Sequence, residues 1–387
     1  MNIVFYYQYD IIPEMGGTER ATYAIACELE KNGFSCFFIA RERHIVNGGC
    51  LPTDSRQFYL PDSSALYTAE NESFLHNFFS SYQIEVLINQ APMEEHPSLF
   101  SREIFPEVRI FSVIHYEPFG VITQFGDVIK GNYIYGDISY IKYLLQRFLV
   151  PYYKHKIKKE QEREYRNLSS ISDKVILLSE RYIPAYPSND LSRLAAIPNP
   201  LTLNPPSRHV PKEKMILVVS RHVYAIKRID YLLQAWHLLE KSFPEWKVCI
   251  LGDGPGKKFN MNSARQMNLQ NVEFCGRVDP QSYYERASIV CLTSTSEGFG
   301  LVLTEGMLYG CVPIAFDSYA AVHDIIDHMQ NGILVPAFRV KEYAAQLKLL
   351  MSNAVLLSRM STQARIKAES FSSQRIGEKW KTLLQTP

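Results

Sequence analysis

The chain has 387 residues, of which 46% are hydrophobic, so it can bury one large core or two domain cores. Its formal net charge of +1 provides no overall field that would attract nucleic acid. Its seven cysteines form no Cys-x-x-Cys pair and lie mostly in apolar runs, which argues against a disulfide framework or a zinc site and favours a reducing compartment.

The first residues, Met1-Asn-Ile-Val-Phe-Tyr-Tyr7, lack the basic start and apolar stretch of a signal peptide. Apolar runs long enough to span a bilayer are also missing from the sequence. We therefore expect a cytoplasmic protein, whose only membrane contact would be peripheral, on the inner face of the cell membrane.

The first half of the chain shows the alternation typical of a parallel α/β sheet. A helix is expected over residues 18–31, ending at Asn32-Gly33. Apolar runs predict strands over residues 3–7, 35–40, 86–89, 109–115 and 174–179. Strands separated by helix-length segments imply a Rossmann-like domain covered on both faces.

Gly16-Gly17 follows the first expected strand and opens the first helix. This position suits close approach by a phosphate or a sugar. A turn that needs positive φ at one residue explains the pair as well. The full Gly-x-Gly-x-x-Gly fingerprint of dinucleotide sites is missing.

A second α/β series follows a proline-rich stretch. Residues 195–206 contain four prolines and are predicted to form an interdomain linker, because proline has no backbone N–H to donate to a neighbouring strand. Strands are then expected over residues 215–220, 246–251, 272–275, 288–293, 312–316 and 333–335. Ligands bind at the carboxyl ends of such strands, so the loops that follow them hold the candidate site.

The stretch 294–310 has the features of an anion site. Glu297-Gly-Phe-Gly300 is a glycine-rich turn between an apolar strand and an expected helix, whose opening offers unpaired N–H groups. Glu297 precedes the turn and Glu305 lies about one turn into the helix. A phosphate at the helix start would lie between the two carboxylates, which suits a nucleotide sugar. A surface glutamate and a helix-start glutamate are the plainer interpretation.

Basic residues and further loops follow other strands of the second half, at the same expected edge of the sheet. Arg221 ends the 215–220 strand and Lys227 precedes the next helix, so both suit a leaving diphosphate. Solvated loop residues are the alternative, and Arg228 adds a third cation. The loops at Gly252 and Val278 follow two more strands and suit contacts to a base, or are simple turns.

The string Glu297-Gly-Phe-Gly-Leu-Val-Leu-Thr-Glu305 resembles the acidic motif of retaining glycosyltransferases of family 4. Residues 310–317 and 331–336 also resemble that family's pattern. The resemblance implies the GT-B fold, with two Rossmann-like domains facing each other across a cleft. Residues 1–200 would form the acceptor domain and residues 207–370 the nucleotide-sugar domain. Helix 371–387 would pack back on the first domain.

The resemblance also implies roles for individual residues. Glu305 would bind ribose hydroxyls, and Glu297 the hydroxyls of the donor sugar. Arg221, Lys227 and the amides around Phe299, Gly300 and Leu301 would hold the diphosphate. Gly16 and Gly17 would contact donor and acceptor, and His115 would contact the donor sugar. The family often has Asp after this histidine, where this chain has Tyr116.

The implied enzyme is a retaining hexosyltransferase that needs neither a metal ion nor another cofactor. The Asp-x-Asp motif of metal-dependent glycosyltransferases does not occur. Residues 323–328, with two His and two Asp, resemble a metal cluster but are explained as well by a loop. UDP is the expected nucleotide, on family frequency. The expected acceptor is a glycan or a lipid-linked glycan of a bacterial surface polysaccharide, such as lipopolysaccharide or capsule.

Other functions stay open at this point. A GT-B nucleotide-sugar epimerase would share the fold but would need acid and base groups for proton exchange. A nicotinamide-dependent oxidoreductase is disfavoured by the missing glycine fingerprint and by the two α/β halves. A nucleotide-sugar-binding homologue without transferase activity is disfavoured by the complete set of Arg221, Lys227, Glu297 and Glu305.

Residues 133–166 combine seven tyrosines with eight basic residues and several large aliphatic ones. This composition suits a helix at an anionic membrane surface, near a lipid-linked acceptor. A solvated helix is the alternative, since Glu160, Glu162 and Glu164 offset nearby cations.

Overall fold

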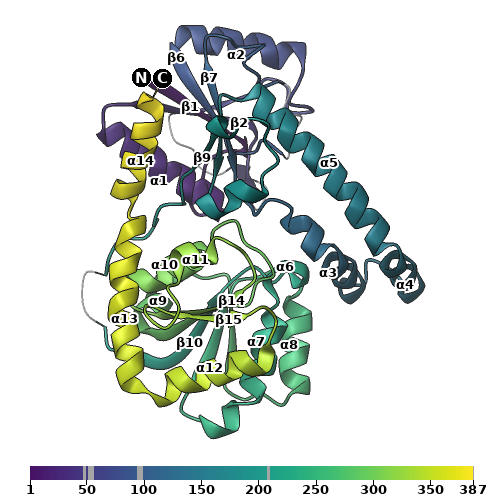
Figure 1. Cartoon of the computed structure of the whole chain (residues 1–387), viewed down its shortest axis with the longest axis vertical. Coiled ribbons are helices and arrows are strands. Elements are labelled where there is room, and N and C mark those ends of the chain that lie inside the picture. Colours follow the sequence, from purple (N-terminus) through teal and green to yellow (C-terminus); the bar gives the residue numbers. More distant parts are fainter. Residues whose placement is uncertain (47–48, 51–55, 94–98, 207–209, 387) are drawn as a thin grey trace. The chain divides into compact units, whose positions relative to one another are not determined.

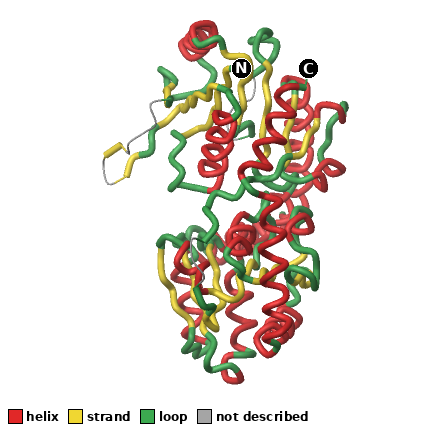
Figure 2. Tube along the Cα trace, turned by 90° about the vertical axis from the view of Figure 1, so that its left-hand side faces the viewer, coloured by secondary structure: helices red, strands yellow, loops and turns green. Residues whose placement is uncertain are grey.

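The computed structural model describes residues 1–46, 49–50, 56–93, 99–206 and 210–386. Contacts divide the chain into two units. Unit 1 consists of Met1–Pro118, Lys159–Thr202 and Phe371–Pro387, and unit 2 of Phe119–Lys158 and Leu203–Ser370. In each unit helices flank a sheet of strands (Figures 1 and 2).

Unit 1 contains a seven-stranded sheet in the order β5-β2-β1-β6-β7-β8-β9, and all six of its strand pairs are parallel. The strands are β1 (Asn2–Tyr9), β2 (Ser35–Glu42), β5 (Gln57–Tyr59), β6 (Ile84–Asn89), β7 (Arg109–Ile114), β8 (Lys174–Leu177) and β9 (Leu194–Ala196). β3 (Ile45–Val46) and β4 (Gly49–Cys50) form a separate antiparallel pair.

All five strands expected in the first half are confirmed, and β5 and β9 are additions at the two edges. β9 lies where the expected linker began. Its three residues pair with β8 because Leu194, Ala195 and Ala196 can still donate and accept ladder hydrogen bonds before the first proline at 198.

The helices of unit 1 are α1 (Gly17–Lys31), α2 (Ala69–Ser81), the end of α5 (Val150–Ile171) and α14 (Ser373–Gln385), with short 3-10 turns at Glu180–Ala185 and Leu191–Arg193. A further 3-10 turn, Glu369–Phe371, lies where the chain passes from unit 2 to unit 1. α14 packs on α1 although nearly the whole chain separates them (Figure 1). Lys381 Nζ donates to Asn32 Oδ1 at 3.0 Å. A Cβ at Gly377 would lie 2.4 Å from Glu28 Cγ, so glycine permits this close approach.

Unit 2 contains a six-stranded parallel sheet in the order β12-β11-β10-β13-β14-β15. The strands are β10 (Glu213–Val219), β11 (Lys247–Leu251), β12 (Val272–Gly276), β13 (Ala287–Leu292), β14 (Val312–Asp317) and β15 (Ile333–Pro336). Every strand expected in the second half is confirmed. β13 is buried along its whole length, which explains its continuous apolar sequence.

The remaining helices belong to unit 2. They are α3 (Gly120–Tyr135), α4 (Tyr140–Phe148), the start of α5, α6 (Tyr224–Lys227), α7 (Ile229–His237), α8 (Lys257–Gln266), α9 (Gln281–Arg286), α10 (Leu301–Leu308), α11 (Val322–Ile325), α12 (Val340–Ser352) and α13 (Ala354–Ala368), with a 3-10 turn at Glu240–Ser242. α7 places Ile229, Leu232, Leu233 and Trp236 in the core, as its periodicity predicts.

The segment Phe119–Lys158 was expected to belong to the first domain, within residues 1–200. Its contacts instead assign it to unit 2. Tyr224 N donates to the hydroxyl of Tyr135 at 2.6 Å, and Arg228 Nη1 lies 3.4 Å from Asp127 Oδ1. These contacts join α3 to the start and end of α6. No helix of the described residues combines the length and the hydropathy needed to cross a membrane.

Candidate active site

The candidate site of unit 2 lies where its strand order reverses. The chain runs from β10 outward to β11 and β12, and then returns to β13 on the other side of β10. The loops after β10 and β13 are joined by Thr295 N donating to Ile226 O at 2.7 Å and Thr293 Oγ1 donating to Lys227 O at 3.1 Å. Such a switch point is the usual ligand position in an open parallel sheet.

Lys227 and Glu297 come from these two loops and form an ion pair. Their side chains are 18% and 15% exposed, so the pair is half-buried at the rim of the sheet. Ser294 Oγ donates to the same carboxylate oxygen, Glu297 Oε1, at 2.6 Å. The fold thus brings together two residues that are 70 positions apart and that the sequence analysis singled out separately.

Gly300 forms the turn that starts α10. Its φ of 101° is in the left-handed region, and a Cβ there would lie 2.5 Å from the Tyr319 hydroxyl oxygen. Phe299 is buried, and Leu301 is the first residue of the helix. The first amides of α10 therefore lie three residues beyond Glu297, so a helix start, the usual kind of position for an anion, is close to the ion pair in sequence.

Glu305 lies inside α10 and is fully buried. The hydroxyl of Tyr284, on α9, donates to Glu305 Oε2 at 2.9 Å. The Tyr284 ring stacks on Tyr309 at 6.0 Å, and the hydroxyl of Tyr309 donates to Asn204 O at 2.8 Å. Sequence reasoning missed Tyr284, since nothing in the short helix 281–286 indicates that it faces α10.

The three cations after β10 have different surroundings. Arg221 is exposed at the end of β10. Arg228 is buried and donates from Nε and Nη2 to the two carboxylate oxygens of Asp230, each at 2.9 Å. The Arg228 guanidinium also lies 3.7 Å from the ring centre of Tyr231. Arg228 is thus bound within the fold, whereas Arg221 and Lys227 lie along the loop that faces the switch point.

The loop after β11 is held tightly against the loop after β10. Gly252 has φ of 121°, and a Cβ there would lie 2.0 Å from Ser220 O. The amide of Gly252 donates to Gly276 O at 2.7 Å, which joins this loop to the end of β12. Val278, just beyond β12, is 43% exposed. Gly252 and Val278 therefore occupy neighbouring strand ends, as the parallel sheet requires.

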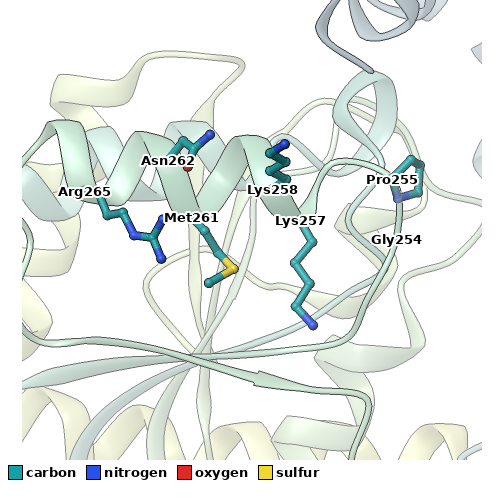
Figure 3. A pocket seen from close by; sticks show the side chains of 7 residues that line it. All are labelled: Gly254, Pro255, Lys257, Lys258, Met261, Asn262 and Arg265. Carbon is teal, nitrogen blue, oxygen red and sulfur yellow. The ribbon is translucent and has the colours of Figure 1, made fainter. Parts of the chain in front are cut away.

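A cavity of about 430 Å³ lies beside this loop, along α8 (Figure 3). It is lined by Gly254, Pro255, Lys257, Lys258, Met261, Asn262 and Arg265. Lys257 Nζ is paired with Asp253 Oδ2 at 3.0 Å. Neither Lys227 nor Glu297 lines this cavity, so the switch point, and not the cavity, carries the candidate chemistry.

Unit 1 holds the other expected site residues, at its own switch point between β1 and β6. Gly16 precedes α1 with φ of −165°, so the expectation of positive φ does not apply to it. A Cβ at Gly16 would lie 2.4 Å from Glu19 Oε2, the far end of a flexible side chain that would have to move aside. Gly17 is the first residue of α1. His115 follows β7, and its Nε2 is hydrogen-bonded to Gln90 Oε1, after β6.

Burial lowers the pKa of His115 to about 4, from its ordinary 6.5. The folded chain then holds a neutral imidazole at neutral pH, while the unfolded chain takes up a proton as the pH falls through 6.5. The stability that this group contributes is therefore complete above 6.5 and is lost as the pH falls toward 4.

We expect His115→Gln to reduce the fall in melting temperature between about pH 7 and pH 5, because the variant lacks the buried imidazole that must take up a proton only on unfolding in this window. Differential scanning fluorimetry at the two pH values measures this fall. His155→Gln, at an exposed position on α5, serves as the control. An unchanged pH dependence in His115→Gln would show that other groups cause the loss.

The residues 323–328 are not gathered as one ligand set. His323 Nε2 is bonded to Asp317 Oδ1 at 2.8 Å, and Asp327 pairs with Lys367 at 2.9 Å. In the described part of the chain, Cys249, Glu273 and Cys275 do lie together, with ligand atoms within 4.8 Å of one another. They are at the β11–β12 edge, where Cys249 is buried, which raises its pKa to about 12 and disfavours the thiolate.

Comparison with known proteins gives this geometry a context. The family described as glycosyl transferases group 1 matches residues 202–367, which include Arg221, Lys227, Glu297 and Glu305. A glycosyltransferase of Haemophilus influenzae without an assigned reaction is 32% identical over 55% of this chain and 61% of its own length. The poly(ribitol-phosphate) α-N-acetylglucosaminyltransferase of Staphylococcus aureus is 28% identical over 59% of this chain and 47% of its own length. The chain thus spans less than two thirds of either relative.

Solved structures match over the whole chain. The crystal structure of TarM has a TM-score of 0.75 at 15% identity, covering 100% of this chain and 99% of TarM. The pneumococcal O-GlcNAc transferase GtfA, solved with UDP and GlcNAc, has a TM-score of 0.72 at 16% identity, covering 100% of this chain and 98% of GtfA. The two parallel-sheet domains therefore form the GT-B fold, and residues 202–367 are similar to the glycosyl transferases group 1 family.

Proposed function

We propose that this chain is a retaining, metal-independent hexosyltransferase of family 4. It would transfer a sugar from a nucleotide-diphosphate sugar, with UDP favoured, to a glycan or lipid-linked acceptor of a bacterial surface polysaccharide. The observation that supports this most directly is the switch point of unit 2. There Lys227, Glu297 and the start of α10 lie together inside the region similar to group 1 glycosyl transferases.

The geometry suits a diphosphate held by cations and amides. Lys227 and the exposed Arg221 would face the phosphates, with the first amides of α10 after Gly300 as further donors. Lys227 pairs with Glu297 in the structure. On donor binding the lysine would turn to the phosphates and leave the carboxylate for sugar hydroxyls. Glu305 would accept from the ribose hydroxyls, next to Tyr284.

The proposed chemistry is front-face displacement. The acceptor hydroxyl forms a bond to the anomeric carbon on the side from which the diphosphate leaves, and its proton goes to the departing phosphate oxygen. Charge develops on that oxygen, so preorganised cations and amides stabilise the transition state more than the ground state. The role of His115 toward the donor sugar stays a prediction.

The relatives support the donor and acceptor classes. Three of them are named as α-transferases, acting on poly(ribitol-phosphate), poly(glycerol-phosphate) and an undecaprenol-linked glycan. An α-linked product is what retention gives from an α-linked nucleotide sugar. UDP is present in the structures of GtfA and of Anabaena HepE. A polymer or lipid-linked acceptor and a UDP-sugar donor are therefore our preferred substrates.

Thermal unfolding with nucleotides tests the donor class. We expect UDP to raise the melting temperature, and EDTA to leave that rise unchanged, because a ligand at about a hundred times its Kd adds roughly 2.7 kcal/mol to the free energy of unfolding. GDP, ADP and NAD are the matched ligands. A rise with GDP or ADP alone would assign the donor to that nucleotide in place of UDP. A rise with NAD alone would contradict the proposal. Loss of the UDP effect with EDTA would contradict metal independence.

Product analysis after incubation with a nucleotide sugar distinguishes a transferase from an epimerase and from a homologue that only binds. A transferase needs an acceptor, and ¹H NMR of the product would show an α-linkage. An epimerase converts the nucleotide sugar without an acceptor, and a binding-only homologue shifts with UDP but gives neither product.

A further inference from the structure

The surface of α4 is apolar on its outward side. Ile141, Leu144, Leu145 and Phe148 follow the spacing i, i+3, i+4, i+7, which places them on one helix face. All four are exposed, and Phe148 reaches 85%, Ile141 71% and Leu145 63%. Surface helices usually show charged residues on this side, so this stripe is the reverse of the normal pattern.

The opposite face of α4 accounts for its packing within unit 2. Tyr143 is the buried residue of this helix, and its ring stacks on Tyr133 of α3 with centres 5.0 Å apart. α3 in turn packs on α6 (Figure 1). The outward stripe is therefore not needed to hold α4 in place, and it continues into α5 through the exposed Tyr152 and Tyr153.

The charged residues of the segment that carries the stripe, between Asp137 and Glu160, are all basic. Residues 138–159 contain six lysines and arginines and no aspartate or glutamate, in a chain whose net charge is only +1. Lys142 and Lys156 are exposed. Arg147 donates to the hydroxyl of Tyr143 at 2.7 Å. An apolar stripe with tyrosines and lysines at its border is the pattern of a helix that lies in a membrane interface.

We propose that α4 and the start of α5 form a docking surface for an anionic lipid bilayer. The stripe enters the boundary between headgroups and acyl chains, and the lysines pair with anionic headgroups. A second copy of this chain fits the surface less well. A two-fold interface would place the cationic segment against itself, and like charges repel. Lipid anions complement the charge, and the acyl boundary covers Phe148.

Co-sedimentation of the full chain with vesicles tests this surface. We expect binding to vesicles of phosphatidylcholine with phosphatidylglycerol and weaker binding to phosphatidylcholine alone. The triple variant Ile141→Ser/Leu145→Ser/Phe148→Ser should lose about tenfold or more of the binding, because it removes most of the apolar area. Lys142→Gln/Lys156→Gln should weaken binding to the anionic vesicles only, as should high salt.

Leu238→Ser/Val355→Ser/Ile366→Ser is the matched control, because these residues are also exposed aliphatic side chains of unit 2 and lie outside the stripe. An unchanged UDP-induced rise in melting temperature would show that the triple variant of the stripe is folded. This readout also separates failure of the docking surface from failure of the proposed reaction. The proposal is overturned if the wild-type chain binds neither vesicle, or if the triple variant of the stripe binds as the wild type does. A wild-type dimer that the same variant converts to a monomer, without vesicle binding, would assign the surface to a second copy.

Discussion

Replacing Lys227 by alanine is expected to lower kcat for sugar transfer by about 100- to 1000-fold, the usual cost of removing one preorganised group that meets developing charge. Lys227 lies at the switch point of the unit 2 sheet and is positioned by its backbone, since its carbonyl accepts from Thr293 Oγ1. The change removes an ion pair whose side chains are only 18% and 15% exposed, and it leaves the Glu297 carboxylate still accepting from Ser294 Oγ. We therefore expect the free energy of unfolding to fall by about 1–3 kcal/mol. Kinetics measured well below the melting temperature of the variant separate the lost activity from this loss of stability.

Single-turnover kinetics with a UDP-sugar and an acceptor would measure this effect, because they separate the chemical step from product release. Lys348→Ala is the matched control, an exposed lysine on α12. Arg221→Ala, Glu297→Ala and Glu305→Ala should also lower transfer by orders of magnitude while the chain stays folded. If two or more of the four variants kept nearly normal turnover, the active site would have to lie elsewhere.

The strands of both sheets could be predicted from the sequence because they are parallel and buried. A strand such as β13 is covered on both faces and is therefore apolar throughout, so its limits differ from the expected ones by one residue at each end. The three-residue strands β5 and β9 were missed, since edge pairing requires no comparable apolar run.

The place of α3 and α4 could not be predicted, for a different physical reason. The composition of residues 133–166 suits a helix, but it does not show which surface receives that helix, and α3 was not predicted. The contacts that join α3 to unit 2 are specific pairs, such as that of Tyr135 with the amide of Tyr224. Pairwise contacts of this kind between residues 89 positions apart leave no local pattern in the sequence.

In the candidate site, too, local features could be predicted and contacts between distant residues could not. Glu297, Gly300 and Glu305 belong to one continuous string, so its spacing alone indicates a turn and a helix start. The partner of Glu305 could not be predicted from this string, since Tyr284 lies on another helix. Arg228 and Lys227 are neighbours in sequence, yet only the fold shows that Arg228 is bound to Asp230 while Lys227 faces Glu297.

Gly252→Ala is expected to lower the free energy of unfolding of unit 2 by more than about 3 kcal/mol, among the largest effects of a single methyl group. The new Cβ would lie 2.0 Å from Ser220 O and 2.8 Å from Ser220 C, and these backbone atoms cannot rotate away. The φ of 121° adds strain for any residue with a side chain. Calorimetry of the full chain, in which unit 2 can melt separately, would measure the loss.

Gly276→Ala provides the control, because it shares the positive φ without the clash. Its φ is 73°, and the nearest atom to a new Cβ is the flexible Lys257 Nζ at 3.9 Å. The left-handed conformation alone should cost about 1–2 kcal/mol. Equal losses in the two variants would show that the clash at Ser220 is relieved by a loop shift. Arg221 follows Ser220 directly, so that shift should then weaken UDP binding in Gly252→Ala and leave it unchanged in Gly276→Ala.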